Sequence, residues 1–200
     1  MKKLPTLLRE VRACQICAEH LPLEPRPVLS VGAKARVLLI GQAPGTRVHD
    51  TLVPWNDPSG DRLREWLGVD REQFYDSGEF GIMPMGFCYP GKGSSGDLPP
   101  RPECAATWHE LLLAHMPPIR VTLLLGQYAI AHYLSDRGKS NLTETVRAWK
   151  SYRPRFVPLP HPSPRNNLWL KKNPWFTAEV VPYLRRRIKQ ALTAARSDRK

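Results

Sequence analysis

Four cysteines are the residues whose type and spacing point most directly to chemistry. Cys14 and Cys17 form a Cys-x2-Cys pair, a spacing that lets both sulfurs reach one metal ion or one corner of a cluster. Cys88 and Cys104 follow much later, and the chain has no further cysteine. Four thiolates fit a 4Fe-4S cluster or a structural zinc site. The alternative is an incidental pair and two buried free thiols.

Two loop motifs could also carry chemistry, and each follows an apolar run. The first, GQAPG at 41–45, is glycine-rich but has neither the GxxxxGK[ST] of a Walker loop nor the GxGxxG of a dinucleotide fingerprint. It therefore needs a ligand other than a nucleotide phosphate. The second, HPSPRNN at 161–167, places His161 before two prolines that fix the backbone. A single histidine is more often structural than catalytic, but at the end of a strand and between prolines the two roles are equally expected for His161.

Apolar runs predict the strands that must position these motifs. They lie at 36–40, 80–83, 120–125 and 155–159, and each meets Gly or Pro at its carboxyl side. Helical patterns lie between them. We therefore expect an α/β fold with a central, mainly parallel four-stranded sheet, helices on both faces, and a site at the carboxyl ends of the strands.

The helical patterns are apolar stripes at helix spacing, and Pro182 should kink the last pattern or mark a new start. The expected inward residues are Leu63, Trp66 and Leu67; Trp108, Leu111 and Leu112 within 104–115; Ala129, Ile130, Tyr133 and Leu134; and Phe176, Val180, Leu184 and Ile188. The Pro/Gly/Ser-rich stretch at 89–103 is expected to be a long loop, with Lys92 and Arg101 available to phosphates, and residues 193–200 are expected to fray.

Composition suits one domain over 1–200 and a polyanionic partner. Of 200 residues, 42% are hydrophobic, enough for a core without disulfides. Thirty Lys and Arg against eighteen Asp and Glu give a net charge of +12, which favours nucleic acid over a generically basic surface. The start lacks a signal-peptide core, and no apolar run approaches a membrane span, so a cytoplasmic monomer is expected.

With these cysteines and loop motifs, the chain resembles the uracil-DNA glycosylase superfamily, and within it the iron-sulfur group often called family 4. The resemblance covers about residues 10–190. CQIC corresponds to the amino-terminal ligand pair of that group, and Cys88 and Cys104 correspond to its other two ligands. Gly41 to Gly45 matches its first motif, LLLGQYAIAHYL its Leu-Gly strand-helix turn, and His161-Pro162-Ser163 its second motif. The resemblance implies a 4Fe-4S cofactor that acts as a structural clamp.

The resemblance also implies a pocket for a base flipped out of DNA. Pro54-Trp55 falls where the family has the aromatic that stacks on that base, although Trp55 could instead be a core residue. His161 would donate a hydrogen bond to a base carbonyl oxygen on which negative charge develops. Backbone N–H groups of 42–45 would position a water molecule or bind a base edge.

Residues after His161 would form a loop that enters the minor groove of DNA. The resemblance makes Arg165 the wedge that fills the gap left by the flipped nucleotide. The string HPSPRN resembles the single-strand-selective branch more than family 4. Lys171 and Lys172 are either phosphate contacts or ordinary surface lysines. The expected DNA-binding residues are Ser163, Pro164, Arg165, Asn166, Lys171 and Lys172.

Two departures from the family pattern concern the water and the base edge. Gln42 stands where family 4 has glutamate, and Ala43 stands where other branches have the Asp or Asn that orients the water. The nearest substitutes are Asp50 and Asp57, so the expected catalytic residues are His161, Gln42, Asp50 and Asp57. Pro84 occupies the place of the Asn that reads uracil, which leaves base selection to backbone near 84–87, Gln42 or Asn56. The expected base-binding residues are Gly41, Gln42, Ala43, Trp55, Asn56 and Pro84.

The resulting expectation is a monofunctional DNA glycosylase of base excision repair. It would hydrolyse the N-glycosidic bond of a deaminated base, first of all uracil, with hypoxanthine and xanthine as alternatives. A second reading is a catalytically weak member that binds damaged or single-stranded DNA. A third is a zinc-stabilised nucleic-acid-binding module.

Overall fold

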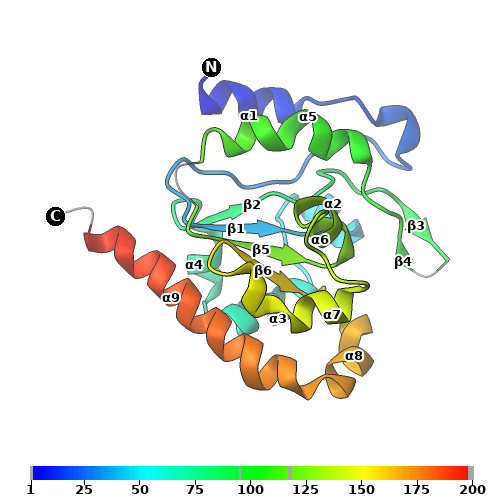
Figure 1. The fold of residues 1–200 in the computed structure, drawn as a ribbon. Helices are drawn as coiled ribbons and strands as arrows, with labels where there is room; N and C mark the ends of the chain where they lie inside the picture. The colour runs from blue at the N-terminus through cyan, green and yellow to red at the C-terminus, as the bar shows by residue number, and fades with distance from the viewer. Residues whose placement is uncertain (1, 95, 117–118, 198–200) are drawn as a thin grey trace.

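A parallel sheet of four strands lies at the centre of the computed structural model, which describes residues 2–94, 96–116 and 119–197 (Figure 1). The strand order is β2-β1-β5-β6, and every residue of these strands is buried. A strand covered on both faces needs continuous apolar sequence, which is why the four predicted runs are confirmed as strands. The strands are β1 (Val37–Ile40), β2 (Phe80–Ile82), β5 (Val121–Leu125) and β6 (Phe156–Leu159).

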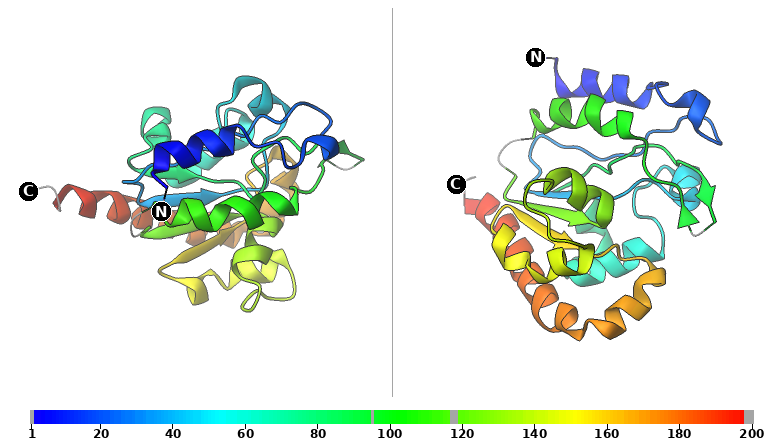
Figure 2. Two further views of the ribbon diagram at one scale, coloured as in Figure 1. Left: turned by 90° about the horizontal axis from the view of Figure 1, so that it is seen from above. Right: turned by 45° about the vertical axis from the view of Figure 1, so that its right-hand side comes forward.

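Helices cover both faces of the sheet. The pair α1 and α5 lies on one face, and α3 packs against α9 on the other (Figures 1 and 2). The helix α6 packs against β5, and α7 packs against β6. These helices are α1 (Leu4–Arg12), α3 (Pro58–Leu67), α5 (Pro102–Leu113), α6 (Gln127–Tyr133), α7 (Leu142–Arg147) and α9 (Val181–Ser197). The other helical segments are η1 (Ala18–His20), α2 (Thr46–Thr51), α4 (Arg71–Tyr75), η2 (Trp149–Tyr152), η3 (Pro164–Asn166), α8 (Asn167–Lys172) and the π-helix η4 (Phe176–Val180).

One predicted inward residue is wrong. Leu111 of α5 is 51% exposed, whereas its neighbour Leu112 is fully buried. Successive helical residues point about 100° apart, and α5 turns Ala105, His109 and Leu112 toward the core. The apolar periodicity is compatible with burial of either Leu111 or Leu112. His109 is polar, so its burial, which would have fixed the rotation of the helix, could not be predicted from hydrophobicity.

The last apolar stripe forms as predicted, with all four of its residues buried. Pro182 follows the π-helix η4 directly, and the helical run 174–197 continues through it without a break, so the expected interruption takes the form of a π-helical turn rather than a new start. Residues 193–197, expected to fray, continue α9, and 198–200 lie outside the described residues. Within the described part of the chain, no helix is both long and apolar enough to cross a membrane.

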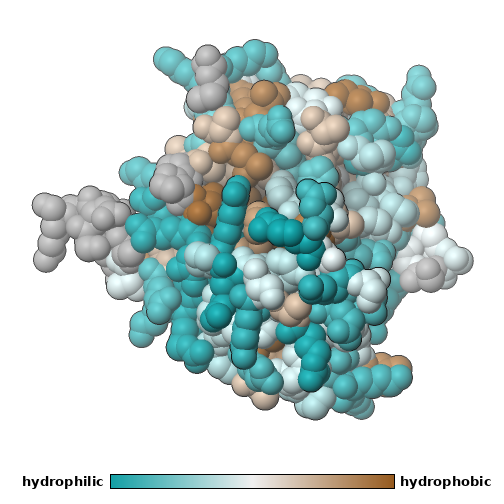
Figure 3. Space-filling model, viewed as in Figure 1, coloured by the Kyte–Doolittle hydropathy of each residue, from teal (hydrophilic) through white to brown (hydrophobic). Residues whose placement is uncertain are grey.

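The expected loop at 89–103 contains a small antiparallel hairpin. Its strands are β3 (Lys92–Gly93) and β4 (Gly96–Asp97), which project from the rest of the fold (Figures 1 and 2). Lys92 is the register partner of Asp97. Gly96 has φ +146°, a conformation that side-chain-bearing residues rarely adopt. Around the hairpin, the visible face of the molecule is largely hydrophilic, with apolar residues in small separate groups (Figure 3).

Candidate active site

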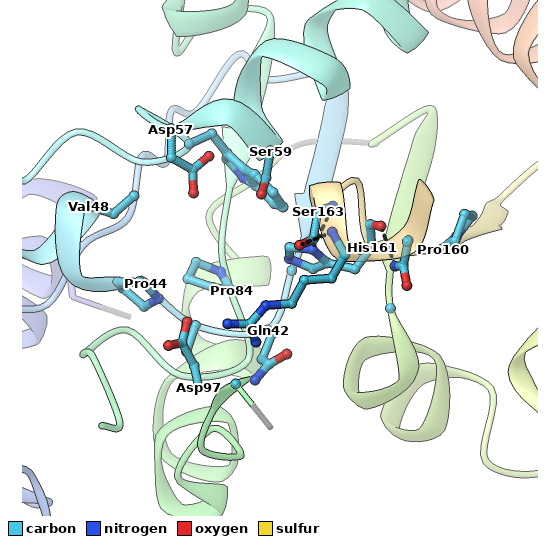
Figure 4. A pocket seen from close by; sticks show the side chains of 18 of the residues that line it. Gln42, Pro44, Val48, Asp57, Ser59, Pro84, Asp97, Pro160, His161 and Ser163 are labelled. Carbon is cyan, nitrogen blue, oxygen red and sulfur yellow. Dashed lines mark hydrogen bonds between the residues drawn. The ribbon is translucent and has the colours of Figure 1, made fainter. Parts of the chain in front are cut away.

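The two loop motifs meet at one cavity of about 620 Å³ at the carboxyl ends of the strands. Residues of the first loop, 41–45, line one side, and His161, Ser163, Arg165 and Asn166 line another. The β3–β4 hairpin and the start of α6 complete the wall. Figure 4 shows His161 and Ser163 on the opposite side of the cavity from Pro44 and Asp97. The position is the one that a doubly covered parallel sheet offers to a ligand.

Trp55 is held as a wall of this cavity by unusual backbone geometry. Its φ is +58°, and its carbonyl oxygen accepts a 3.3 Å hydrogen bond from Arg64 Nη1. Gly41 lies beneath the indole, and a Cβ at that position would be 2.8 Å from Cζ2 of the ring. Trp55 is partly buried and lines the cavity, so it is a pocket residue rather than a member of the closed core.

His161 is arranged to donate through Nε2. The backbone N–H of Ser163 donates to Nδ1 at 3.3 Å, which requires an unprotonated Nδ1 and places the proton on Nε2. Burial lowers the pKa of His161, while the charge of Asp57 opposes part of this shift. The side chain of Asn166 donates to the carbonyl oxygen of His161 at 2.7 Å. The ring is therefore a neutral, fixed donor at neutral pH.

Of the two carboxylates predicted to take part in catalysis, only Asp57 lines the cavity (Figure 4). One of its oxygens caps α3 by accepting the N–H of Gly60 at 2.8 Å. Asp50 is exposed on α2 and is not among the residues that line the cavity. The structure therefore brings Asp57 to His161 and leaves Asp50 outside.

The predicted base-reading side chains have other partners. Gln42 lines the cavity, but its Nε2 donates to the carbonyl oxygen of Leu98 at 3.1 Å. Asn56 is not among the lining residues, and its Oδ1 accepts a 2.9 Å hydrogen bond from Arg71. Gly41 and Ala43, both from the first motif, also line the cavity. Asn56 thus lies outside the cavity lining, and Gln42 lines the cavity with its Nε2 already bonded to the hairpin.

Pro84 also lines the cavity, above a buried polar relay. Its carbonyl oxygen lies 3.0 Å from Nε2 of His109, and Nδ1 of that ring lies 2.7 Å from the hydroxyl of Tyr133. The carbonyl can only accept, so His109 donates through Nε2 and accepts from Tyr133. Burial lowers the pKa of His109 to about 4. A neutral histidine thus fixes the backbone at Pro84.

The loop after His161 is braced against its surroundings. Arg62 donates to the carbonyl oxygen of Ser163 at 3.0 Å and to Oδ1 of Asn167 at 2.7 Å. Pro164 begins the short helix η3. Arg165 reaches the hairpin, because a Cβ on Gly96 would lie 2.2 Å from its Nη1. Lys171 and Lys172 are exposed on α8, outside the cavity lining.

Three further polar residues of the cavity, Ser59, Asp97 and Gln127, were missed by the sequence analysis. Gln127 follows the Leu-Gly turn after β5 and lines the cavity; its place after a strand was a usable signal. Asp97 lines the cavity from β4. Because it lies within a Gly/Ser-rich stretch, nothing in the local sequence distinguished it from a loop residue.

The four cysteines line a second, smaller cavity of about 20 Å³. It lies where the segment after α1, the loop after β2 and the start of α5 meet. Cys104 Sγ accepts the backbone N–H of Phe87 at 3.3 Å. Burial raises the pKa of Cys88 to about 11 and that of Cys104 to about 12. As arranged, no group of three or more His, Cys, Asp or Glu side chains among the described residues could hold a metal ion.

Comparison with known proteins supplies a family. Among solved structures, the chain is similar to wild-type Pedobacter heparinus SMUG2, with 15% sequence identity, a TM-score of 0.35, and coverage of 82% of this chain and 76% of that one. The family model described as the uracil DNA glycosylase superfamily matches residues 29–185, a span that contains both cavity loops and the whole sheet. The chain therefore belongs to the uracil DNA glycosylase superfamily.

Proposed function

We propose that the protein is a DNA glycosylase that releases a deaminated base, first of all uracil, by hydrolysis of the N-glycosidic bond. One observation carries the proposal. The neutral imidazole of His161 stands beside the indole of Trp55, with ring centroids 5.5 Å apart, in a cavity lined by both family motifs. A flat base stacked on the indole would bring a ring carbonyl toward Nε2–H of His161.

The proposed reaction needs no side-chain nucleophile. As the C1′–N bond breaks, its electron pair moves onto the base, and negative charge spreads to the carbonyl oxygen. The fixed Nε2–H of His161 stabilises that charge. A water molecule adds to C1′, leaving a free base and an abasic sugar.

Base selection falls to Gln127 in this proposal. Of the side-chain amides among the described lining residues, Gln42 donates to Leu98 and Asn166 donates to His161. Gln127 has an amide at the cavity wall beside Gly126, whose Cα faces His161. A primary amide can donate to one base carbonyl and accept from the neighbouring ring N–H, which suits uracil.

Hypoxanthine and xanthine remain the second candidates, because Pro84 offers no side-chain amide where the family reads uracil. Oligonucleotides carrying uracil, hypoxanthine or xanthine, in single and double strands, distinguish these substrates after alkaline cleavage of abasic sites. Release of uracil supports the first proposal, and release of a purine alone supports the second. Salt-dependent binding without any release would support a catalytically weak DNA-binding member.

We further propose that the four thiolates hold a 4Fe-4S cluster. The donor set fits, because all four cysteines line one cavity and Cys104 already accepts an N–H···S bond of the kind that tunes such clusters. A cubane cluster presents a separate iron to each thiolate, so the sulfurs need not converge on one point. When bound, the cluster supplies a crosslink between the segment after α1 and α5. A brown protein with iron and sulfide supports the cluster, whereas colourless protein with bound zinc supports the zinc site.

A further inference from the structure

We infer that Asp97, on the β3–β4 hairpin, is the carboxylate that orients the attacking water and accepts its proton. The inference rests on the proposed glycosylase function and assigns a residue that neither family motif contains. It answers the question raised by Gln42 and Ala43, where the first motif has no carboxylate.

Only two described residues of the cavity lining carry carboxylates, Asp57 and Asp97. One oxygen of Asp57 is committed to the N-cap of α3, and its charge acts on His161. The negative charge of Asp57 favours the protonated form of His161, whereas the proposed mechanism uses the neutral form as the hydrogen-bond donor to the base. Asp97 is exposed, with no ion pair among the described residues, and lies across the cavity from His161 (Figure 4).

Asp97 lies beside the first loop, because its Oδ2 is 3.5 Å from where a Cβ on Gly45 would be. In this proposal the base stacks on Trp55 with its sugar between His161 and the hairpin, so that a water molecule held by Asp97 reaches C1′. The side chain of Ala43 in that loop is only a methyl group, so the hairpin brings a carboxylate to a loop that lacks one.

Gln42 keeps the hairpin in this position. Its Nε2 donates to the carbonyl oxygen of Leu98, the residue that follows Asp97, at 3.1 Å. The N–H of Leu98 in turn donates to the carbonyl oxygen of Gly91 at 2.8 Å, which closes the base of the hairpin. Gln42 is thus a positioning residue that acts through Asp97, which gives a role to a glutamine in place of a catalytic acid.

The step balances as follows. The C1′–N bond breaks, and its electron pair stays with the base, whose carbonyl oxygen accepts the hydrogen bond from His161. The water oxygen forms a bond to C1′, and its proton passes to the carboxylate of Asp97. That proton is then released to the departing base or to solvent, so the products are the neutral base and a sugar with a hydroxyl at C1′.

Single-turnover base release tests the inference. Asp97→Asn should slow release about 10²-fold to 10⁴-fold, the usual contribution of a general base, while DNA affinity stays within about twofold. Asp136→Asn removes the same charge at an exposed position outside the cavity lining and should leave the rate unchanged. Adding sodium formate to Asp97→Ala should restore part of the rate, with sodium chloride at equal ionic strength as the control. A structural role would give no such rescue.

A double-mutant cycle tests the link to Gln42. If Gln42 acts through Asp97, Gln42→Ala should slow wild type clearly but slow Asp97→Asn little further. Full additivity would overturn the positioning role. An active wild type with an unimpaired Asp97→Asn variant would overturn the assignment of Asp97 alone. No release of any base by wild type would overturn the proposed function and this inference together.

Discussion

Trp55 and His161, from opposite halves of the chain, lie with their ring centroids 5.5 Å apart and their planes at 31°. The carboxyl end of β1 leads to one residue and that of β6 leads to the other. Because β5 alone separates these strands in the sheet, the two loops meet at one cavity. A base stacked on the indole would therefore have its carbonyl oxygen within reach of the imidazole.

Replacing His161 should affect catalysis far more than binding. In His161→Ala, single-turnover base release should fall about 10²-fold to 10³-fold, because a fixed donor to the developing anion is lost. Affinity for the same oligonucleotide, measured by fluorescence anisotropy, should change by less than about threefold. His115→Ala, outside the cavity lining, is the control. An unchanged rate in His161→Ala would move the anion-stabilising role elsewhere.

Gly41→Ala should displace the stacking wall. The added Cβ would lie 2.8 Å from Cζ2 of Trp55, too close for the indole to keep its place. Base release should fall about tenfold or more, because displacing a group that positions the substrate slows the reaction by at least that factor. The smaller ring in Gly41→Ala/Trp55→Phe should recover part of the rate relative to Gly41→Ala. A double variant slower than both single variants would contradict this view of the contact.

The strands and both loop motifs could be predicted because continuous burial leaves an unmistakable apolar signal. The rotation of α5 about its axis could not be predicted, because Leu111 and Leu112 are equally apolar in the sequence. The side of α5 that faces the core is set by His109, a buried polar residue. Hydrogen-bond partners that lie far apart in the sequence also could not be predicted. Gln42 and Asn56 looked available in the sequence, but each bonds a residue placed by tertiary structure, Leu98 and Arg71.

The hairpin shows the same limit. A Pro/Gly/Ser-rich stretch predicts a loop, but the ladder of β3 and β4 depends on glycine conformations rather than on side-chain pattern. Asp97 is therefore visible as a cavity residue only in three dimensions. Its proximity to the first loop has no counterpart in sequence spacing.

His109 should make stability depend on pH. Its pKa is lowered by burial to about 4 from an ordinary value of 6.5, so the unfolded chain binds a proton first as pH falls. The contribution, about 3 kcal/mol, is complete above about pH 6.5 and is lost between there and about pH 4. Urea unfolding across this range should show a shallower pH dependence for His109→Gln than for wild type. Equal slopes would contradict a neutral buried histidine.

If the four cysteines hold the proposed 4Fe-4S cluster, replacing one of them should lower stability. Cys104→Ser should abolish the brown colour and reduce the free energy of unfolding by about 3 kcal/mol, a fall in Tm of roughly 6–12 °C for a chain of this size. Ser151→Ala, which changes one exposed hydroxyl, is the control for preparation. Iron content and thermal melts measure both effects, and a variant that keeps iron and Tm would exclude Cys104 as a ligand.

Lys171 and Lys172 should contribute salt-dependent affinity. Each neutralised phosphate adds about 0.9 to the slope of log K against log salt, so Lys171→Gln/Lys172→Gln should reduce that slope by about 2. Arg186→Gln/Lys189→Gln removes the same charge from exposed positions on α9 and should leave the slope nearly unchanged. Equal reductions in both variants would show that only net charge matters.

Direct identification of the released product is the sharpest test of the glycosylase proposal. Wild-type protein is incubated with an oligonucleotide that carries a single uracil, and both products are identified by mass spectrometry; hypoxanthine and xanthine oligonucleotides run in parallel. We expect free uracil and a strand that has lost the base and gained a hydroxyl at C1′, with both products formed about 10²-fold to 10³-fold more slowly by His161→Ala. Intact strands for all three bases, from a protein that binds them, would contradict the proposal.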